Sequence, residues 1–500
     1  MPENEGQDIP LAAPTILDRS RHSISRRNID PDALKVLNRL HRHGFLAYLV
    51  GGAVRDLMLG RTPQDFDVGT NARPRQVKKL FRNAYLIGRR FRLAQVRFQG
   101  GKVIEVATFR RDPGPGEPEP PEDGREDGHP EDAEFREGGA CPGEELGAEE
   151  AKAAGGKPEE EKAGAGETET EHEAEEEEEE EEAAEGRGRR KGRPPLPPIA
   201  FGTPREDAFR RDITINALFY DISTFSVIDY TGGLEDMQRR RIRVIGPPER
   251  RYVEDPVRMW RVLRHAGRLG FSVEEETERA IAEHRLLLAS CSGSRLYEEL
   301  NKDLKSGASR PILGGLRRHG LLSVLLGAPG AFYETSEEAS RRLEALLGVS
   351  DASAAAGRPL SAAETYGLLF HAWADGLLAG FSGDRFMLLH DALAGAAMAI
   401  TLPRALAADL VQTLVIADRM LAALESGRMR WTLRRRARYA EASRLCAIVA
   451  EGRDEGSPDP FEVLFRRRFG GAPETGEKKR RRRRRPRRKP PSPPAEPEAS

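Results

Sequence analysis

Cysteine is scarce in this chain of 500 residues, which contains only three. Cys141, Cys291 and Cys446 lie far apart, and no C-x-x-C spacing occurs. This pattern gives no support to a disulfide framework or to a zinc site. A reducing, cytoplasmic compartment is the simplest prediction.

Long hydrophobic runs are also missing. No stretch approaches the ~18 apolar residues of a membrane span, and the N-terminus MPENEGQDIP lacks a basic segment followed by an apolar one. We therefore expect a protein that is neither exported nor embedded in a membrane. Hydrophobic residues make up only 38% of the chain, so part of it is expected to be unfolded.

Net charge is nearly absent, at −1, but this sum hides two opposed segments. Residues 112–198 are dominated by Pro, Gly, Glu and Ala and contain the unbroken acidic run Glu175 to Glu182. Such a segment cannot bury enough apolar surface to offset the entropy cost of ordering it. We predict a disordered acidic insertion there and a disordered Arg-rich tail at 471–500.

The basic tail reads EKKRRRRRRPRRK. Each phosphate that such a tail neutralises releases a counterion, so the tail is predicted to grip RNA or DNA without sequence preference. A solubility tail, or a tail that docks an acidic protein, is the alternative. The candidate RNA-binding residues are Arg480, Arg481, Arg482, Arg483, Arg484 and Arg485.

Residues 47–67, AYLVGGAVRDLMLGRTPQDFD, carry the clearest chemical pattern. We predict a strand over 47–50, a turn at Gly51 and Gly52, and a short helix that is closed by Gly60. Glycines where a strand turns into a helix let the backbone approach a phosphate, whose charge the free N–H groups of a helix start favour. The pattern indicates a nucleotide site.

A second strand is predicted to carry Asp65 and Asp67. Residues two apart on a strand point to one side, so both carboxylates should share a face, with Phe66 turned into the core. Two carboxylates beside a phosphate-binding turn suit Mg²⁺-assisted phosphoryl or nucleotidyl transfer, because hard cations prefer oxygen ligands. An isolated Asp-x-Asp in so charged a chain is also common as a solvated turn.

The segment LVGGAVRDLMLGRTPQDFDVGTNA resembles the head domain of the class II nucleotidyltransferases, which comprise bacterial poly(A) polymerases and CCA-adding tRNA enzymes. The resemblance implies an α+β fold, in which a head of mixed sheet and helices precedes an all-helical neck, body and tail. The expected divisions are a flexible arm at 1–29, the head at 30–111 and 199–235, a neck at 236–320 that binds nucleotide and RNA, and a body at 321–470 that binds RNA.

Glu105 interrupts the predicted strand KVIEVATF, which follows a strand expected over AYLIGRRFRLAQVRF. A buried carboxylate is costly unless something pairs with it. A strand adjacent to the two aspartates could deliver Glu105 to the same metals, and in the resembling family a glutamate sits beside the pair. Alternatively, Glu105 faces solvent and pairs with Arg89, Arg90 or Arg92.

The segment RRDITINA, predicted to start as a strand, resembles the second motif of the family. The resemblance implies that Asp212 supports the ribose or works with the metals, and that Arg211 and Asn216 lie close to the phosphates. A structural ion pair among Arg210, Arg211 and Asp212 at a strand end is the alternative.

The segment EDPVRMWRVLRHAGRLG predicts a helix with Asp255 as N-cap, Pro256 as the first helical residue and Gly270 as the stop. Its arginines should fall on one side, as a solvated surface or an anion-binding wall; they are Arg258, Arg261, Arg264 and Arg268.

EDPVRM resembles the motif that reads the incoming base, which implies that Asp255 and Arg258 face its Watson–Crick edge with Arg261 near them. A guanidinium offers donors in a fixed fork and a carboxylate accepts from an exocyclic amine. The remaining residues expected to bind the nucleotide are Gly51, Gly52, Arg55 and Arg264.

Residues 272–453 have a helical pattern without a catalytic constellation. SRLYEELNK resembles the family helix that follows the base-reading motif, and we expect it to pack the neck. The histidines show no metal-ligand spacing, so structural or surface roles are expected for His265, His284, His319, His371 and His390.

Together these patterns predict a monomeric enzyme that adds AMP from ATP to RNA 3′ ends without a template. Two Mg²⁺ ions would be held by Asp65 and Asp67, with Glu105 or Asp212 completing the set. Candidate partners are messenger RNAs, small RNAs, tRNA and proteins of RNA decay.

Poly(A) polymerases and CCA-adding enzymes share all of the motifs described above. LIGRRFRLAQVRF resembles the poly(A) polymerase version of its strand pair, whereas CCA-adding enzymes usually show a Gly-Thr and His-Gly-Thr pattern that is absent here. The basic tail also favours poly(A) addition. A CCA-adding enzyme, a non-catalytic RNA-binding scaffold and a small-molecule nucleotidyltransferase are the alternatives.

Overall fold

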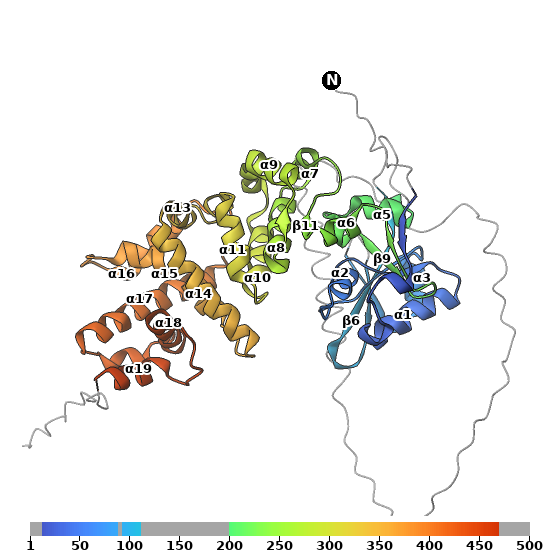
Figure 1. Cartoon of the computed structure of the whole chain (residues 1–500). Coiled ribbons are helices and arrows are strands. Elements are labelled where there is room, and N and C mark those ends of the chain that lie inside the picture. Colours follow the sequence, from blue (N-terminus) through green and yellow to red (C-terminus); the bar gives the residue numbers. More distant parts are fainter. Residues whose placement is uncertain (1–12, 89–92, 112–199, 470–500) are drawn as a thin grey trace, which may run out of the picture. The chain divides into compact units, whose positions relative to one another are not determined.

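The computed structural model describes residues 13–88, 93–111 and 200–469 (Figure 1). The predicted acidic insertion, the Arg-rich tail with its six candidate RNA-binding arginines, and the three arginines at 89, 90 and 92 lie outside the described residues. Nearly all described residues belong to one unit of the chain, made of residues 9–110 and 202–500.

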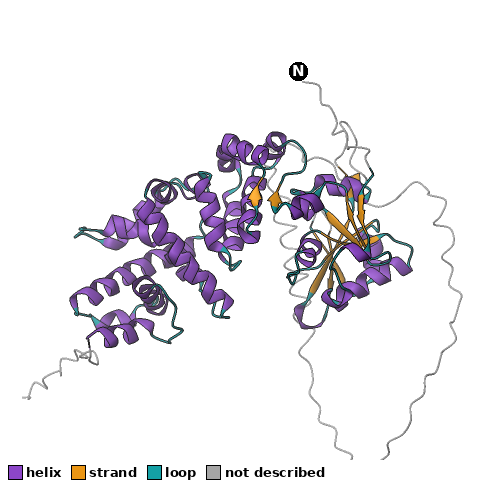
Figure 2. Cartoon of the chain, viewed as in Figure 1, coloured by secondary structure: helices purple, strands orange, loops and turns teal. Residues whose placement is uncertain are grey.

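The head contains a mixed eight-stranded sheet in the order β1-β10-β9-β2-β3-β6-β5-β4 (Figure 2). Every neighbouring pair is antiparallel except β3 and β6, which are parallel. The strands are β1 (Thr15–Leu17), β2 (Ala47–Val50), β3 (Asp67–Thr70), β4 (Ala84–Ile87), β5 (Leu93–Arg97), β6 (Val103–Thr108), β9 (Leu218–Asp221) and β10 (Ser226–Asp229).

Helices of the head cover the sheet. Their bounds are α1 (Pro31–Arg42), α2 (Gly52–Met58), α3 (Pro74–Leu80), α5 (Pro204–Arg210) and α6 (Gly233–Gln238), with short 3₁₀ turns η1 (Arg19–Arg21), η2 (Arg26–Asn28), η3 (Gln99–Gly101) and η4 (Thr214–Asn216). Helices α1 and α3 pack on the main hydrophobic core, and a smaller cluster around Val50, Phe109 and Phe219 also includes Ala208 of α5.

Helix α1 shows how local sequence sets an element. The Asp30 carboxylate accepts hydrogen bonds from the backbone N–H groups of Asp32 and Ala33, and Pro31 occupies the first helical position, where no N–H is needed. The helix buries Val36, Leu37 and Leu40 against the core, and its predicted start is confirmed.

Three predictions for the head need correction. Part of the predicted flexible arm belongs to the sheet, because β1 pairs with β10 and Ile24 is fully buried. AYLIGRRFRLAQVRF forms two antiparallel strands, β4 and β5, rather than one. RRDITINA does not begin as a strand, because it forms the 3₁₀ turn η4 before β9.

Gly233 is needed where α6 begins. A Cβ atom at this position would lie 2.3 Å from the carbonyl oxygen of Thr214, closer than any side chain tolerates. The preceding Gly232 has φ +82°, a left-handed conformation that favours glycine. Close packing of α6 against η4 therefore requires the Gly-Gly pair.

After α6 the chain is almost entirely helical (Figure 2), apart from the parallel pair β11 (Arg241–Ile242) and β12 (Ser272–Val273). A further pair, β7 (Arg110–Arg111) and β8 (Ala200–Phe201), flanks the predicted insertion. The first helices are α7 (Pro248–Glu254), α8 (Val257–Leu269), α9 (Glu275–His284), η5 (Arg285–Ser290), α10 (Gly293–Leu304), α11 (Ser309–Arg318), α12 (Leu321–Leu326) and α13 (Ala328–Thr335).

The remaining helices are α14 (Glu337–Ala355), α15 (Ala362–Leu378), α16 (Arg385–Ala394), α17 (Arg404–Ser426), η6 (Trp431–Arg435), α18 (Tyr439–Glu451) and α19 (Pro460–Phe469). The predicted α+β architecture, a mixed-sheet head followed by a helical region, is confirmed. Among the described residues, none of the helices has the length and apolar character of a membrane span.

Candidate functional site

The glycine turn follows β2 directly. Gly51 adopts φ +71° and ψ −133°, and its N–H donates to the carbonyl oxygen of Leu218. A Cβ atom here would lie 3.1 Å from Nη1 of Arg211, so the missing side chain leaves room for that guanidinium beside the turn. The predicted order of strand, double glycine and short helix is confirmed.

Two carboxylates meet on adjacent strands. Asp67 is the first residue of β3, and its partner in the parallel register with β6 is Glu105. Cross-strand partners project from the same face of a sheet, so both carboxylates lie side by side. Gln95, the antiparallel partner of Glu105 on β5, donates a hydrogen bond to its Oε1 at 3.2 Å.

Within the part of the chain that the structure describes, the negative charge of Asp67 and Glu105 is only partly compensated. Burial raises the pKa of Asp67, the Glu105 charge raises it further, the Arg211 charge lowers it, and the Asp65 charge raises it, with a net pKa of about 6. A carboxyl with so high a pKa lacks a cation strong enough to balance its neighbours. This is the electrostatic signature of a site that can accept a cation.

Asp65 differs from its prediction. It lies in the loop before β3 and is exposed, so the two aspartates do not share one strand. Its charge nevertheless acts on Asp67, and Phe66 packs against the hydrophobic core as expected. The loop, rather than strand alternation, positions Asp65.

Polar contacts link the glycine turn to η4. Arg211 pairs with Asp207 at 3.0 Å, and its Nη1 donates to the Asn216 carbonyl oxygen at 3.2 Å. Arg55, buried on α2, donates from Nη1 to Oδ1 of Asn216 at 2.6 Å. Arg55, Arg211 and Asn216 therefore gather at the turn, as the resemblance implies.

His265 on α8 completes this network, in the structural role expected for it, although the sequence did not indicate its partner. Its Nε2 lies 2.7 Å from Nδ2 of Asn216. Burial, followed by the charges of Arg55 and other nearby arginines, lowers the pKa of His265 well below its ordinary value. The neutral ring accepts the amide hydrogen bond and joins the head to helix α8.

Asp212 lies with the arginines of α8. Its Oδ1 accepts from Nε of Arg258 at 3.0 Å, and its Oδ2 accepts from Nη1 of Arg261 at 2.9 Å. Burial raises the pKa of Asp212, but the hydrogen bonds and charges of Arg261 and Arg258 outweigh it and lower the pKa. The alternative of an ion pair with Arg211 is not what the contacts show, because Arg211 pairs with Asp207.

Asp255 and Arg258 lie at the start of α8. Asp255 accepts a hydrogen bond from the backbone N–H of Val257 at 3.2 Å. The predicted cap is nevertheless one residue early, because Pro256 is the N-cap and Val257 the first helical residue. Asp255 also pairs with Arg295 of α10 at 2.8 Å. Gly270 ends the helix in the left-handed conformation, as predicted.

Arg264 does not belong to an anion-binding wall. It is 8% exposed, and its guanidinium pairs with Glu299 and Asp303 of α10. Asp303 also accepts a hydrogen bond from Nε1 of Trp260. These acids occupy the donors of Arg264, which therefore packs α8 against α10. The expected role of SRLYEELNK in packing the neck agrees with this contact.

A metal site made by protein ligands alone does not form in the part of the chain that the structure describes: no group of three or more His, Cys, Asp or Glu side chains is arranged to hold a metal. Asp67 and Glu105 supply carboxylate oxygens at one point, and Asp212 is engaged elsewhere. Magnesium commonly binds to one or two carboxylates together with substrate phosphates and water, so these two residues fit such an ion.

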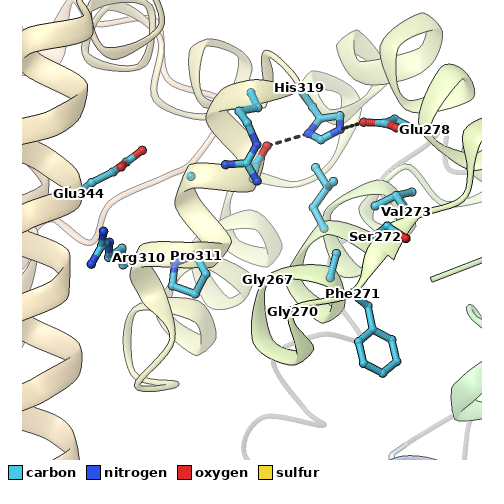
Figure 3. Close-up of a pocket in the computed structure, with 15 residues that line it drawn as sticks. Gly267, Gly270, Phe271, Ser272, Val273, Glu278, Arg310, Pro311, His319 and Glu344 are labelled. Carbon is cyan, nitrogen blue, oxygen red and sulfur yellow. Dashed lines mark hydrogen bonds and ion pairs between the residues drawn. The ribbon is translucent and has the colours of Figure 1, made fainter. Parts of the chain in front are cut away.

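A cavity of about 700 Å³ lies among α8, α9 and α11 (Figure 3). Neither Asp67 nor Glu105 lines it. His319 on its wall contacts the Gly315 carbonyl oxygen through Nδ1 and a carboxylate oxygen of Glu278 through Nε2, each at 2.8 Å. The exposed Arg310 and Arg318 also line it. The cavity wall is mixed, because it combines apolar residues with these arginines and with the acids Glu278 and Glu344.

Comparison with known proteins identifies two matching regions. Residues 47–137 and 151–243 match the family described as "Poly A polymerase head domain". Residues 270–333 match that described as "Probable RNA and SrmB- binding site of polymerase A". The first match contains the glycine turn, the carboxylates and Asn216, and the second contains most of the cavity wall.

The chain is 38% identical to poly(A) polymerase I of Salmonella typhimurium over 330 residues, which are 66% of this chain and 57% of that relative. It is 31% identical to the CCA-adding enzyme of Bacillus pumilus over 274 residues, 55% of this chain and 49% of that relative. The chain thus spans about half the length of these curated relatives.

The structure is similar to that of the Bacillus stearothermophilus CCA-adding enzyme in complex with CTP. The TM-score is 0.52 at 24% identity, covering 88% of this chain and 83% of that chain. Similarity at this identity concerns the fold, and it agrees with the mixed-sheet head and helical region described above.

Proposed function

We propose that the chain transfers AMP from ATP to RNA 3′ ends without a template, because its residues match a poly(A) polymerase head domain and it is similar to poly(A) polymerase I. The observation that carries this proposal is the pairing of Asp67 with Glu105 in the β3–β6 register, beside the turn at Gly51. Carboxylates that are only partly compensated, next to a phosphate-sized turn, suit nucleotidyl transfer.

Asp67 and Glu105, with Asp65 nearby, are the residues that would hold Mg²⁺. The elevated pKa of Asp67, caused first by burial and then by the Glu105 charge, supports this assignment, because a divalent cation would stabilise the ionised carboxylates. When bound, the two ions we propose would activate the 3′-hydroxyl and stabilise the pyrophosphate leaving group.

The chain's own residues would orient the nucleotide. We assign the triphosphate to Gly51, Gly52, Arg55 and Arg211, since the arginine guanidinium groups converge on the turn. Asn216 fixes Arg55 through its side chain and Arg211 through its backbone, so it acts as a positioning residue.

We assign the base to Asp255, Arg258 and Arg261. Asp212 holds both arginines with its two carboxylate oxygens, and we propose that it orients them toward the base. This role takes Asp212 out of the proposed metal set, which leaves Glu105 as the third carboxylate.

The RNA would reach this site along the helical region. The match of residues 270–333 to a family described as RNA-binding, together with Arg310 and Arg318 on the cavity wall, supports an RNA contact there. Messenger RNAs, small RNAs and tRNA as acceptors, RNA-decay proteins as partners, a monomeric state and a cytoplasmic location remain predictions.

CCA addition is the second candidate, because relatives named as CCA-adding enzymes match at 31% identity. The higher identity to poly(A) polymerase I favours AMP addition. An assay separates the two: the purified protein is given a tRNA lacking its terminal CCA, or an oligoadenylate, with ATP or CTP separately. We expect long AMP extension of oligoadenylate, whereas rapid CMP incorporation into the tRNA would contradict the choice.

A further inference from the structure

The segment between α17 and α18, GRMRWTLRRRAR, contains six arginines at residues 428–438. It includes η6 and lies outside both regions that match a family, the second of which ends at 333. Leu433, 7% exposed, anchors the segment in the core. The arginines around that anchor are therefore presented from a fixed backbone.

The segment is attached to α19 at two points. Arg434 pairs with Asp459 at 3.1 Å and with Glu462. A Cβ atom at Gly427 would lie 3.2 Å from Cε1 of Phe469, so the end of α17 touches the end of α19. Helices α17, α18 and α19 lie close together in Figure 1, in agreement with their contacts.

Most acids near the segment are already ion-paired; the exposed Glu425, three residues before Arg428, forms no ion pair with any described residue. Asp459 and Glu462 bind Arg434, and Glu462 also binds Arg466. Arg467 pairs with Glu451 and Glu455. These four carboxylates are thus engaged with other arginines, and the single charge of Glu425 leaves most of the remaining positive charge unbalanced.

Five exposed arginines remain, and within the described residues their side chains form no ion pair or hydrogen bond. We call this group the η6 arginine surface; its members are Arg428, Arg430, Arg435, Arg436 and Arg468. Five unpaired guanidinium groups on one part of the surface would repel one another unless a polyanion neutralised them.

We propose that the η6 arginine surface binds the phosphodiester backbone of the RNA substrate, as a contact separate from residues 270–333. The inference rests on the proposed function for the identity of the polyanion. A guanidinium fork matches a phosphate bidentately, and a flexible single strand can adapt to such side chains.

The test changes charge at the surface in the full chain. The quadruple variant R428Q/R430Q/R435Q/R436Q is compared with the wild type for binding of a labelled oligoadenylate by fluorescence anisotropy over a range of salt concentrations. Single-stranded nucleic acid loses about 0.7 in the slope of log K against log salt per lost phosphate contact, so the slope should fall by about 3.

A matched control removes the same charge elsewhere. Lys35, Arg239, Arg341 and Arg342 are exposed and each is ion-paired, so K35Q/R239Q/R341Q/R342Q should leave the slope almost unchanged. The variant with lysine at 428, 430, 435 and 436 keeps the charge and should restore the slope, which separates phosphate binding from a folding defect.

The outcomes are distinct. An unchanged slope in the glutamine variant, or an equal loss in the control, overturns the inference. If the glutamine variant loses binding to poly-glutamate while its salt slope for RNA equals that of the wild type, the inference is overturned in favour of an acidic protein partner. If the wild type adds no AMP to RNA but the glutamine variant still shows the expected fall in slope relative to the wild type, the proposed function fails and the RNA contact stands.

Discussion

In the head, Asp67 lies beside Glu105 and no ion pair to either carboxylate forms among the described residues, whereas in the neck Glu299 and Asp303 both bind the buried Arg264. Burial, followed by repulsion from Glu105, raises the pKa of Asp67 to about 6. Burial also raises the pKa of Glu299, but the Arg264 charge and hydrogen bonds lower it to about 2. Similar residue types thus serve a site in one region and packing in the other.

The difference shows which charged residues can meet a ligand. A buried carboxylate that is already ion-paired cannot also bind a ligand cation, and removing its partner lowers the free energy of unfolding. An acid without a partner is costly to the fold and is retained where a ligand completes it. Charge compensation therefore separates functional from structural carboxylates here better than the motif does.

The largest effect is expected in the neck. Arg264→Ala leaves Glu299 and Asp303 buried and unpaired, which should cost about 3–5 kcal/mol in the free energy of unfolding. Denaturant unfolding measures it. A double-mutant cycle with Glu299→Gln should recover part of the loss; a cost below about 1 kcal/mol would show that the network is not structural.

Asp67→Asn should lower the activity without lowering the stability, in contrast to Arg264→Ala. The change keeps the side-chain size and removes one repelling charge, so AMP incorporation should fall about 10²–10³-fold while stability is unchanged or higher. Initial rates and unfolding midpoints are measured on the same preparations. Mg²⁺ should raise the unfolding midpoint of the wild type more than that of the variant, and equal shifts would argue against Asp67 as a metal ligand.

The two regions should also respond to pH in opposite directions. The pKa of Asp67 is raised from 3.8 in the unfolded chain to about 6, so its contribution to stability is greatest below pH 3.8 and is lost, by about 3 kcal/mol, as pH rises through 6. The pKa of Glu299 is lowered from 4.5 to about 2, so its contribution is present above pH 4.5 and is lost as pH falls toward 2.

The difference in unfolding free energy between the wild type and each variant isolates the contribution of one carboxyl group. The stability difference between wild type and Asp67→Asn should change between pH 4 and 6, and that between wild type and Glu299→Gln should change below pH 4.5. Unfolding free energies measured in urea across this range provide the comparison. A pH-independent difference for Asp67→Asn would mean that its carboxyl is already compensated.

Local sequence was sufficient for much of the fold. Asp30 and Pro31 start α1, the apolar run at 47–50 forms β2, and Gly270 ends α8, because capping bonds, alternation and positive φ angles depend on neighbouring residues. Glu105 could be suspected because a carboxylate in an apolar strand demands a partner. The family resemblance supplied the roles that spacing could not.

The sequence by itself determined the residue types of the site, namely a double glycine, aspartates at a strand start and arginines on one helix. Only the tertiary structure decided their partners. It paired Asp67 with Glu105 through strand register, turned Asp212 toward Arg258 and Arg261, and buried Arg264 against α10. The reason is that a charge's role depends on which opposite charge lies within a few ångströms, and those partners are 35 to 49 residues away along the chain.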